Sequence, residues 1–447
     1  MTEFATIILA GGKGQRMQST RPKVLHEIAG QPMMGYVLAA AQAAGTQLVI
    51  VVTPPEPTTT RHYIDAFMRS SDCTHIHATQ NAPLGTGDAV RCALPHIADI
   101  GRVVIICGDT PLMRPETLAR LANDEAALTI LGFEPADAAA YGRIILKADR
   151  PHKIIEFKDA DAATRKISLC NSGAMAIDSA LLHKLVPKLQ NDNAQQEFYL
   201  TDLLALAVAD GQSTNLVMGT ADEVLGVDSR QGLAHAEQLM QGRLRHKLLA
   251  AGVTMQDPDS VYLSFDTAIA PDVVLEPHIY CGTGVSIGTN CTIRAFSHLE
   301  GVRIGENVSI GPFARLRLGT QIADHARIGN FVETKQAKIG VGSKVNHLSY
   351  IGDATLGRDV NIGAGTITCN YDGFNKHQTI IGDGAFIGSN SSLIAPVTIG
   401  QGAYIGSGTA ISDDVKADAL AVTRADKREI DGWAIKFRQQ QKAKTDE

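Results

Sequence analysis

A glycine-rich turn with three cationic side chains lies near the start of the sequence. It reads Leu9-Ala10-Gly11-Gly12-Lys13-Gly14-Gln15-Arg16-Met17 and is followed by Arg21-Pro22-Lys23-Val24-Leu25. Glycines let backbone N–H groups approach a polyphosphate closely, and Lys13, Arg16 and Lys23 add positive charge. The spacing matches neither the P-loop nor the dinucleotide-binding fingerprint, so both are disfavoured. The turn therefore indicates phosphate binding, with a plain strand-to-helix turn as the alternative.

A second stretch rich in polar side chains lies in the C-terminal half. Its four segments, 330–335, 346–350, 361–365 and 370–373, are dense in Asn, Glu, Lys, His, Tyr and Asp. Imidazole titrates in the range where a base works at neutral pH. His347 lies in the second segment, and the other histidines of the sequence lack such surroundings. The segments therefore indicate a reaction site with a histidine base.

Short apolar runs must position the first cluster. Residues 6–9, 48–52 and 103–106 are β-branched runs bounded by turn residues, which predicts buried strands. Residues 33–44 predict a helix between the first two, and residues 233–251 predict a connecting helix. Strand, helix and strand at this spacing imply a parallel α/β sheet with right-handed crossovers.

The second cluster lies in a part of the chain with a six-residue period. Two unbroken runs carry it: Ile304, Ile310, Leu316, Ile322 and Ile328, then Ile381, Ile387, Leu393, Ile399, Ile405 and Ile411. A coil of short parallel strands has this period, with one aliphatic side chain pointing inward per strand. The register slips between 328 and 339 and between 362 and 381, and the second slip contains a polar excursion at 369–374. Loops that leave a regular scaffold often carry function.

The composition excludes several classes of protein. A net charge of -6 over 447 residues gives no electrostatic reason to expect a nucleic-acid or membrane partner. The seven cysteines form no Cys-x-x-Cys pair and no His/Cys group has zinc-ligand spacing. We therefore expect no zinc, and we interpret His75, His77 and His96 as surface polar residues. Without a signal peptide or an apolar run that spans a bilayer, a cytoplasmic protein is expected.

A series of motifs makes the first half similar to the sugar-1-phosphate nucleotidyltransferases. Leu-Ala-x-Gly-x-Gly-x-Arg-Met followed by Pro-Lys is the first of them. The others follow in order: Gln80, Leu84-Gly85-Thr86-Gly87, Gly108-Asp109-Thr110-Pro111-Leu112, Tyr141-Gly142-Arg143, Ile155-Glu156, Asn171-Ser172-Gly173 and Tyr199-Leu200-Thr201-Asp202. With the hexapeptide half behind it, the chain resembles the bifunctional N-acetylglucosamine-1-phosphate uridyltransferase/glucosamine-1-phosphate acetyltransferases of bacteria over residues 6–425.

The resemblance implies a fold and two reactions. The fold is an α/β nucleotidyltransferase (Rossmann-like) domain at 1–228, a linker helix at 229–250 and a left-handed parallel β-helix of hexapeptide repeats at 251–447. The β-helix would transfer acetyl from acetyl-CoA, the co-substrate, to glucosamine-1-phosphate. The α/β domain would then couple the product to UMP from UTP, giving UDP-N-acetylglucosamine. A homotrimer is also implied, with acetyl-CoA in the grooves between neighbouring β-helices.

The resemblance further assigns the residues of the uridylyl transfer. Asp109 and Asp228 would bind Mg²⁺, and Arg16 and Lys23 would neutralise charge on the phosphoryl group. Glycine backbone would cradle the phosphates. The residues implied to bind UTP or UDP-N-acetylglucosamine are Leu9, Ala10, Gly11, Gly12, Arg16, Lys23, Gln80, Gly85, Thr86, Gly142, Glu156, Asn171 and Asp228.

For the acetyl transfer the resemblance assigns His347 as the general base that takes a proton from the substrate amine. Glu333 would orient His347 or the amine. The residues implied to bind glucosamine-1-phosphate or acetyl-CoA are Arg317, Glu333, Lys335, Tyr350, Asn361, Ala364, Asn370, Tyr371, Ser389, Ser407 and Arg424.

Three positions depart from the family pattern, and two alternatives stay open. Asp228 stands where asparagine is familiar, and a carboxylate is at least as good a ligand for Mg²⁺. Gly11 and Ser407 each occupy a position where alanine is familiar in the family. We expect the change at Gly11 to have no effect on function. The alternatives are a nucleotidyltransferase with a regulatory β-helix, and a C-terminal half that only trimerises. Neither needs the polar set around His347.

Overall fold

The computed structural model describes residues 3–12, 14–97, 100–138, 140–423 and 427–443. Two compact units divide the chain, residues 1–244 and residues 245–447. Lys13 and Arg424, two of the residues singled out above, lie outside the described residues. None of the described helices is long and apolar enough to cross a membrane.

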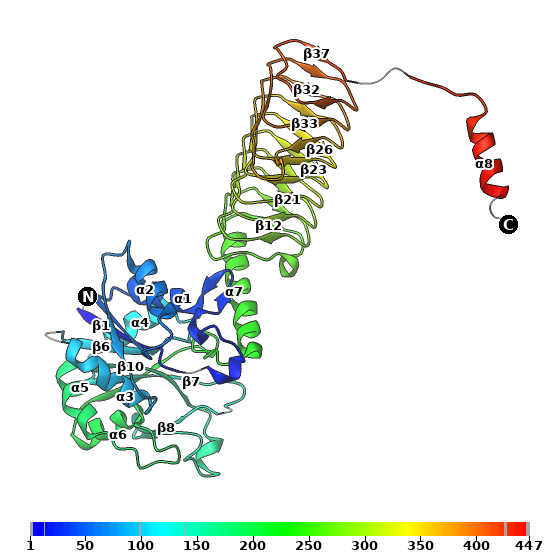
Figure 1. Cartoon of the computed structure of the whole chain (residues 1–447). Helices are drawn as coiled ribbons and strands as arrows, with labels where there is room; N and C mark the ends of the chain where they lie inside the picture. The colour runs from blue at the N-terminus through cyan, green and yellow to red at the C-terminus, as the bar shows by residue number, and fades with distance from the viewer. Residues whose placement is uncertain (1–2, 13, 98–99, 139, 424–426, 444–447) are drawn as a thin grey trace. The chain divides into compact units, whose positions relative to one another are not determined.

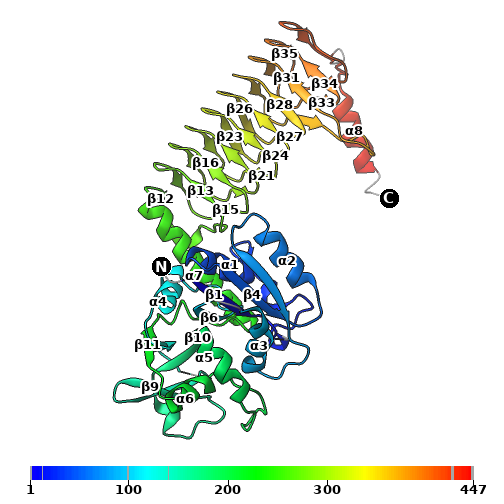
Figure 2. The ribbon, with the colours of Figure 1, turned by 90° about the vertical axis from the view of Figure 1, so that its left-hand side faces the viewer.

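A nine-stranded sheet forms the middle layer of the first unit (Figures 1 and 2). Its main path runs in the order β11-β7-β10-β6-β1-β4-β5, and a β8–β9 hairpin joins it at β10. The bounds are β1 Phe4–Leu9, β4 Leu48–Thr53, β5 Thr74–Thr79, β6 Arg102–Cys107, β7 Leu128–Phe133, β8 Arg143–Lys147, β9 Arg150–Ile155, β10 Cys170–Asp178 and β11 Thr214–Met218. A two-stranded β2–β3 ribbon, Glu27–Ile28 and Gln31–Pro32, is separate.

The three buried strands predicted from the sequence are β1, β4 and β6, and they pair in parallel. Strand β10 is antiparallel to both of its neighbours β6 and β7, so the sheet is mixed rather than wholly parallel. Side chains of β1 alternate between two apolar cores, with Ile8 in one and Ile7 in the other. Helices therefore cover both faces, as the continuous apolar runs require.

Helices α1, α2 and α4 contribute to one core, and helices α3, α5 and α6 contribute to the other. Their bounds are α1 Met33–Ala43, α2 Thr59–Met68, α3 Thr86–Ala93, α4 Pro115–Ala122, α5 Ser179–Leu185 and α6 Asp202–Ala209. Helix α7, Arg230–Ala250, occupies the range expected for a linker. Its first half packs on the α/β unit, since Ala236 and Met240 share a core cluster with Val227.

The second unit is a coil whose strands stack into three parallel sheets, which we call faces 1, 2 and 3 (Figures 1 and 2). Face 1 contains β12 Thr254–Met255, β14 Val274–Leu275, β17 Thr292–Ile293, β20 Ser309–Ile310, β23 Arg327–Asn330, β26 Lys344–His347, β29 Asn361–Ile362, β32 Phe386–Ile387, β35 Tyr404–Ile405 and β37 Leu420–Ala421. Face 2 contains β13 Ala268–Ile269, β16 Ser286–Ile287, β19 Arg303–Ile304, β22 Gln321–Ile322, β25 Lys338–Ile339, β28 Ala354–Leu356, β31 Thr379–Ile381 and β34 Val397–Ile399. Face 3 contains β15 Tyr280–Cys281, β18 His298–Leu299, β21 Arg315–Leu316, β24 Glu333–Lys335, β27 Tyr350–Gly352, β30 Ile367–Cys369, β33 Ser392–Ile394 and β36 Ala410–Ile411.

The eleven aliphatic residues of the six-residue pattern are all buried inside this coil, which confirms the predicted β-helix of hexapeptide repeats. At two positions of face 3 the inward residue is a threonine, Thr334 or Thr368, and both are buried. Thr334 lies 3.0 Å from the Thr320 hydroxyl, and Thr368 accepts a hydrogen bond from the Gly352 N–H at 2.8 Å. These threonines lie within the two stretches where the aliphatic register slips. A last helix, α8 Trp433–Ala443, follows the coil in the sequence.

Candidate functional sites

The carboxyl ends of parallel strands bring the predicted nucleotide-binding residues together in the α/β unit. A pocket of about 260 Å³ is lined by the glycine-rich turn after β1, by Gln80 after β5, by Thr86 at the start of α3 and by Asp109 after β6. A second pocket of about 210 Å³ shares Leu9, Thr86 and Cys107 with the first. Ligands of α/β sheets bind at this end of the strands.

Most of the predicted uridyltransferase residues line one of these two pockets. The first contains Leu9, Gly11, Gly12, Lys23, Gln80, Gly85, Thr86 and Asp109, and the second contains Gly142, Glu156 and Asn171. Ala10, Arg16 and Asp228 line neither. The division places the residues expected at the nucleotide in one pocket and those expected at the sugar in the other.

Two glycines permit close packing in the first pocket. Gly85 has a φ of 108°, and a Cβ there would lie 2.6 Å from the carbonyl oxygen of Phe198. A Cβ at Gly11 would lie 2.7 Å from Oε1 of Gln80. The Gln80 amide group in turn donates to the Gly85 carbonyl at 3.0 Å and to the Asp88 carboxylate at 2.9 Å. An alanine at position 11 therefore requires the Gln80 side chain to move, so the departure at Gly11 is coupled to Gln80.

Each predicted metal ligand is paired with a predicted phosphate-binding cation. Lys23 forms an ion pair with Asp109, and Arg16 lies 2.8 Å from Asp228. The N–H of Val227 donates to the Asp109 carbonyl at 2.8 Å, which ties the two carboxylate-bearing segments together. Asp109 lines the first pocket, and Asp228 lies in the segment tied to it. Carboxylate oxygens are the donors that Mg²⁺ takes, so the residues present fit this ion.

The second pocket is lined by polar side chains that include Glu156 and Asn171. Burial raises the pKa of the Glu156 carboxyl above its ordinary value, although the hydrogen bond from Thr201 at 3.1 Å opposes the shift. Oδ1 of Asn171, which lines this pocket, is buried with no hydrogen-bond partner among the described residues. Buried polar atoms are nearly always paired, so unpaired ones in a pocket are suited to a polar ligand. No role was expected for Thr201, which lines this pocket, although it lies in one of the motifs.

One corner of the β-helix, between face 1 and face 3, carries a column of five residues, four of which are predicted acetyltransferase residues. The strand registers align Ile328, Val345, Ile362, Ile387 and Ile405 on successive coils. The residues two positions later therefore stack at the corner; they are Asn330, His347, Ala364, Ser389 and Ser407, and we call them the corner column. Position in the hexapeptide thus places the candidate base in line with residues expected at the acetyl group and coenzyme A.

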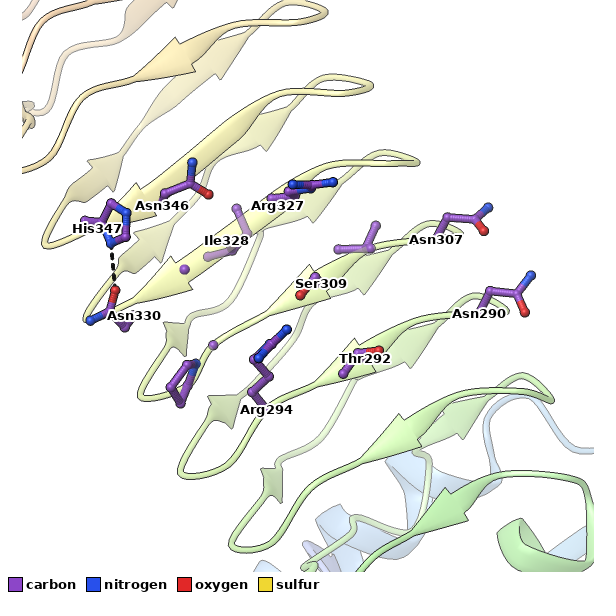
Figure 3. A pocket seen from close by; sticks show the side chains of 14 residues that line it. Asn290, Thr292, Arg294, Asn307, Ser309, Arg327, Ile328, Asn330, Asn346 and His347 are labelled. Carbon is purple, nitrogen blue, oxygen red and sulfur yellow. Dashed lines mark hydrogen bonds between the residues drawn. The ribbon is translucent and has the colours of Figure 1, made fainter.

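His347 is exposed, and its Nδ1 lies 2.9 Å from Oδ1 of Asn330 on the preceding coil (Figure 3). Asn330, and not Glu333, is the hydrogen-bond partner of His347. Both His347 and Asn330 line a pocket of about 600 Å³ that extends along face 1 past Arg294, Ser309 and Arg327 (Figure 3). Asn330 was not among the expected site residues, although it lies in a segment noted for its polar density.

The outer surface of face 3 carries the charged residues of the predicted sugar-phosphate site. Arg317 donates to Glu333 at 2.8 Å, and Glu333 pairs in register with Tyr350 on the next coil. The nearby ammonium of Lys376 lowers the pKa of Lys335. Lys376 was not among the expected site residues. The sequence feature that could have indicated it is its position in the excursion after β30.

In the structure the polar excursion extends to residue 378, and hydrogen bonds within residues 370–378 close it into a loop. Tyr371 and Lys376 form an antiparallel bridge, and the Asn370 side-chain amide donates to the Asp353 carboxylate. The carboxylate of Asp372 accepts hydrogen bonds from the N–H groups of Asn375 at 2.6 Å and Phe374 at 2.8 Å. These two bonds and the bond with His377 lower the pKa of Asp372 to about 2.

Asn361 is not brought to this surface. It lies on β29 of face 1, in register with Lys344 and Phe386, whereas Lys335 and Tyr350 lie on face 3. Arg424 lies outside the described residues.

Two kinds of transferase are defined by these folds and sites. The profile of the MobA-like NTP transferase domain matches residues 6–141. Profiles of hexapeptide-repeat transferases match the second unit: the bacterial transferase hexapeptide (six repeats) at residues 378–413 and the hexapeptide repeat of succinyl-transferase at residues 280–295. The chain thus joins a nucleotidyltransferase to a hexapeptide transferase.

Full-length relatives combine both parts. The bifunctional protein GlmU of Zymomonas mobilis is 45% identical over 448 residues, which cover 99% of each chain. The bifunctional protein GlmU of Azorhizobium caulinodans is 48% identical over 438 residues, covering 97% of this chain and 96% of the relative. The chain belongs to the GlmU family. It is a bifunctional uridyltransferase and acetyltransferase that makes UDP-N-acetylglucosamine, and neither open alternative accounts for a match along the whole β-helix.

Proposed function

We propose that the two pockets of the α/β unit perform the uridylyl transfer. UTP would bind in the first pocket, with its uracil and ribose at Gln80, Gly85 and Thr86 and its phosphates at the glycine-rich turn. N-acetylglucosamine-1-phosphate would bind in the second pocket. The supporting observation is that the pockets adjoin, so the sugar phosphate can attack the α-phosphate in line with release of pyrophosphate. Such a reaction depends on positioning and charge neutralisation.

We further propose that Asp109 and Asp228 hold Mg²⁺ when UTP binds. The ion would supply charge neutralisation on the triphosphate oxygens. Lys23 and Arg16 would then pass from the carboxylates to the phosphates. This exchange keeps each charge paired with an opposite one throughout the cycle, which supports the assignment of both pairs.

For the acetyl transfer we propose that Nε2 of His347 is the base. With Nδ1 protonated and donating to Asn330, Nε2 keeps its lone pair. The amine of glucosamine-1-phosphate attacks the thioester carbonyl, His347 takes a proton from the amine, and coenzyme A leaves as the thiolate. Asn330 acts as a positioning residue, because it selects the tautomer without touching the reacting atoms.

The remaining residues of the β-helix site would bind the two substrates. Arg317 and Lys335, with Lys376, would hold the sugar phosphate, and Tyr350 with Asn361 would contact the sugar. Ala364, Asn370 and Tyr371 would position the acetyl group. Ser389, Ser407 and Arg424 would contact coenzyme A. The corner column supports this order, since Ala364, Ser389 and Ser407 follow His347 on successive coils.

A homotrimer is proposed for the β-helix. Beside the corner column runs an exposed apolar ridge made of Phe296, Phe313, Phe331 and Leu348. The ring of Phe313 stacks on those of Phe296 and Phe331, with centroids 4.9 and 5.2 Å apart. Exposed apolar patches mark contact surfaces, and this one adjoins His347. A neighbouring copy on the ridge would complete the site and bring Asn361 of a second chain to it.

We also propose the cytoplasm as the location, where UTP and acetyl-CoA are available.

The observation that carries these assignments is that the two clusters lie in different units of the chain. His347→Ala should reduce acetyl transfer by about 10²- to 10⁴-fold, the usual contribution of a general base, and leave uridylyl transfer unchanged. Asp109→Ala, or removal of divalent ions by EDTA, should abolish uridylyl transfer and leave acetyl transfer unchanged. Separate assays of both activities on each variant test this. If either substitution removed both activities, or neither, the division of labour would be wrong.

A further inference from the structure

Three side chains of types that can bind metal ions lie close together at the edge of the sheet in the α/β unit. His75 and His77 are two residues apart on β5, so both point to the same side of this strand. Their Nε2 atoms lie 3.0 and 2.7 Å from the same oxygen, Oδ1 of Asp65 on α2. Within the described part of the chain this is the one group of three His, Cys, Asp or Glu residues whose ligand atoms lie within 4.8 Å of one another.

Rigid packing holds the helix that carries Asp65. Ile64 and Met68 of α2 are buried in the core, and Arg61, one turn before Asp65, donates to Thr53 at 2.9 Å and to Thr79 at 2.7 Å. Those threonines end β4 and β5. The helix is therefore fastened to the strand that carries both histidines, and the three ligand atoms are held near one another before any ion binds.

We propose that Asp65, His75 and His77 form a zinc site. Zinc takes imidazole and carboxylate ligands at about 2.0–2.2 Å, so neighbouring ligand atoms in a tetrahedral site lie about 3.3 Å apart. The two observed separations, 3.0 and 2.7 Å, are shorter than this value, and a rotation of the exposed Asp65 side chain would lengthen them. Water would complete the coordination. Imidazole ligands favour Zn²⁺ over Mg²⁺, which distinguishes this site from the pair of aspartates beside the phosphate pocket.

The proposal departs from the expectation that His75 and His77 are surface polar residues and that no zinc is bound. Asp65 is ten residues from His75 in sequence, and no ligand spacing reveals the group; only the packing of α2 on β5 does. A bound ion would link the edge strand to its covering helix. Edge strands present unpaired backbone groups to other chains, and an ion bound only by the folded state stabilises that state.

The test uses the full-length protein after EDTA treatment and dialysis into buffer with excess Mg²⁺, which fills the oxygen sites. Zinc chloride is titrated calorimetrically, and cobalt(II), whose visible absorption reports bound nitrogen and oxygen ligands, is titrated in parallel. Wild type should show zinc binding that His75→Gln and His77→Gln each weaken by more than about tenfold, since loss of even an outer-shell partner costs about that. Zinc should also raise the Tm of wild type but not of the double variant.

His96→Gln is the matched control, because it removes a histidine of the same unit outside the group. It should bind zinc like wild type. The Tm of each variant without metal establishes that the variant is folded. If the double variant is unfolded, His75→Gln replaces it in the comparison. Equal zinc affinity and equal cobalt spectra in the double variant and His96→Gln would overturn the proposal, because the ions would then bind elsewhere.

Discussion

The pairing of His347 with Asn330 joins a side chain that sequence motifs single out to one that they do not. His347 supplies the proposed chemistry, but a free imidazole has two tautomers, and only one of them presents Nε2 as a base. The 2.9 Å contact between Nδ1 of His347 and Oδ1 of Asn330 selects the tautomer whose proton is on Nδ1. Residue-level prediction from motifs is therefore strongest for groups that touch substrate and weakest for the groups that orient them.

Substitution of Asn330 tests this positioning role through the pH dependence of the acetyl transfer. Asn330→Ala should lower the rate about 10- to 100-fold, as expected for loss of an outer partner. Asn330→Asp places a carboxylate beside the ring, which favours the imidazolium form of His347. Because the base must be neutral, the acidic limb of the pH–rate profile should move to higher pH. A purely structural role would leave that limb where it is in wild type.

Glu156 provides a test in which stability and activity change in opposite directions. Burial raises the pKa of Glu156 above its ordinary value of 4.5. The folded-state pKa exceeds the unfolded one, so wild type loses stability as pH rises through this range, and the loss persists above it. Glu156→Gln cannot ionise and should be more stable at neutral pH by about 0.5–2 kcal/mol, a usual gain from relieving such a cost.

Denaturant unfolding of both proteins at several pH values measures this difference. The gain should vanish below the ordinary carboxyl pKa, where Glu156 is protonated in both states. The same variant should raise KM for N-acetylglucosamine-1-phosphate while acetyl transfer stays unchanged. A pH-independent difference in stability would mean that burial of the charge is not its cause.

At the scale of elements, the excursion after β30 inserts a polar loop into the regular coil. Thr334 and Thr368 continue the inward positions, each six residues after an inward isoleucine, and the chain leaves the coil as a loop at 370–378. Polar inward residues hid this continuity from a pattern of aliphatic side chains. The excursion carries Asn370, Tyr371 and Lys376 and is closed by the carboxylate of Asp372.

Asp372→Ala removes the acceptor that closes this loop and should impair the acetyl transfer alone. We expect kcat/KM for acetyl transfer to fall about 10- to 100-fold, because displaced binding groups carry costs of that order. Uridylyl transfer is the internal control. Limited proteolysis should cut the variant within 370–378 faster than wild type. In wild type the carboxylate should keep closing the loop until the pH falls toward about 2, its pKa. A variant with normal acetyl transfer and faster cleavage would show that loop closure does not matter to the reaction.

At the scale of the whole molecule, the proposed trimer gives the two activities different dependence on assembly. The corner column and the apolar ridge lie on the β-helix, so acetyl transfer should require neighbouring copies. The two pockets where uridylyl transfer is proposed lie within one unit. A fragment ending at residue 228 would strip α7 from that unit, although Glu237 of this helix accepts a hydrogen bond from Ala29 at 2.7 Å. Residues 1–250 form the better fragment.

Sedimentation of the full chain and of residues 1–250 tests this assembly. We expect a trimer for the full chain and a monomer with uridylyl transfer for the fragment. Phe313→Glu, which places a charge in the apolar ridge, should dissociate the full chain and reduce acetyl transfer at least about tenfold, while uridylyl transfer continues. A monomeric full chain with undiminished acetyl transfer would exclude a composite site.

Periodicity and composition by themselves determine much of this protein. The six-residue repeat predicts a coil, because one inward side chain per strand must be apolar whatever the rest of the chain does. The β-branched runs predict buried strands for the same reason, and the ordered motifs identify the residues that line both pockets. These are local properties, and each can be recognised in a short segment of the sequence.

The tertiary structure decided which side chains from distant windows meet. It paired Arg16 with Asp228 and Asn330 with His347, and it gathered Asp65, His75 and His77 at one sheet edge. It also made β10 antiparallel and placed Asn361 on a different face from Tyr350. Such contacts depend on how helices pack on strands and how coils stack, and packing is a property of the whole chain that no short window contains.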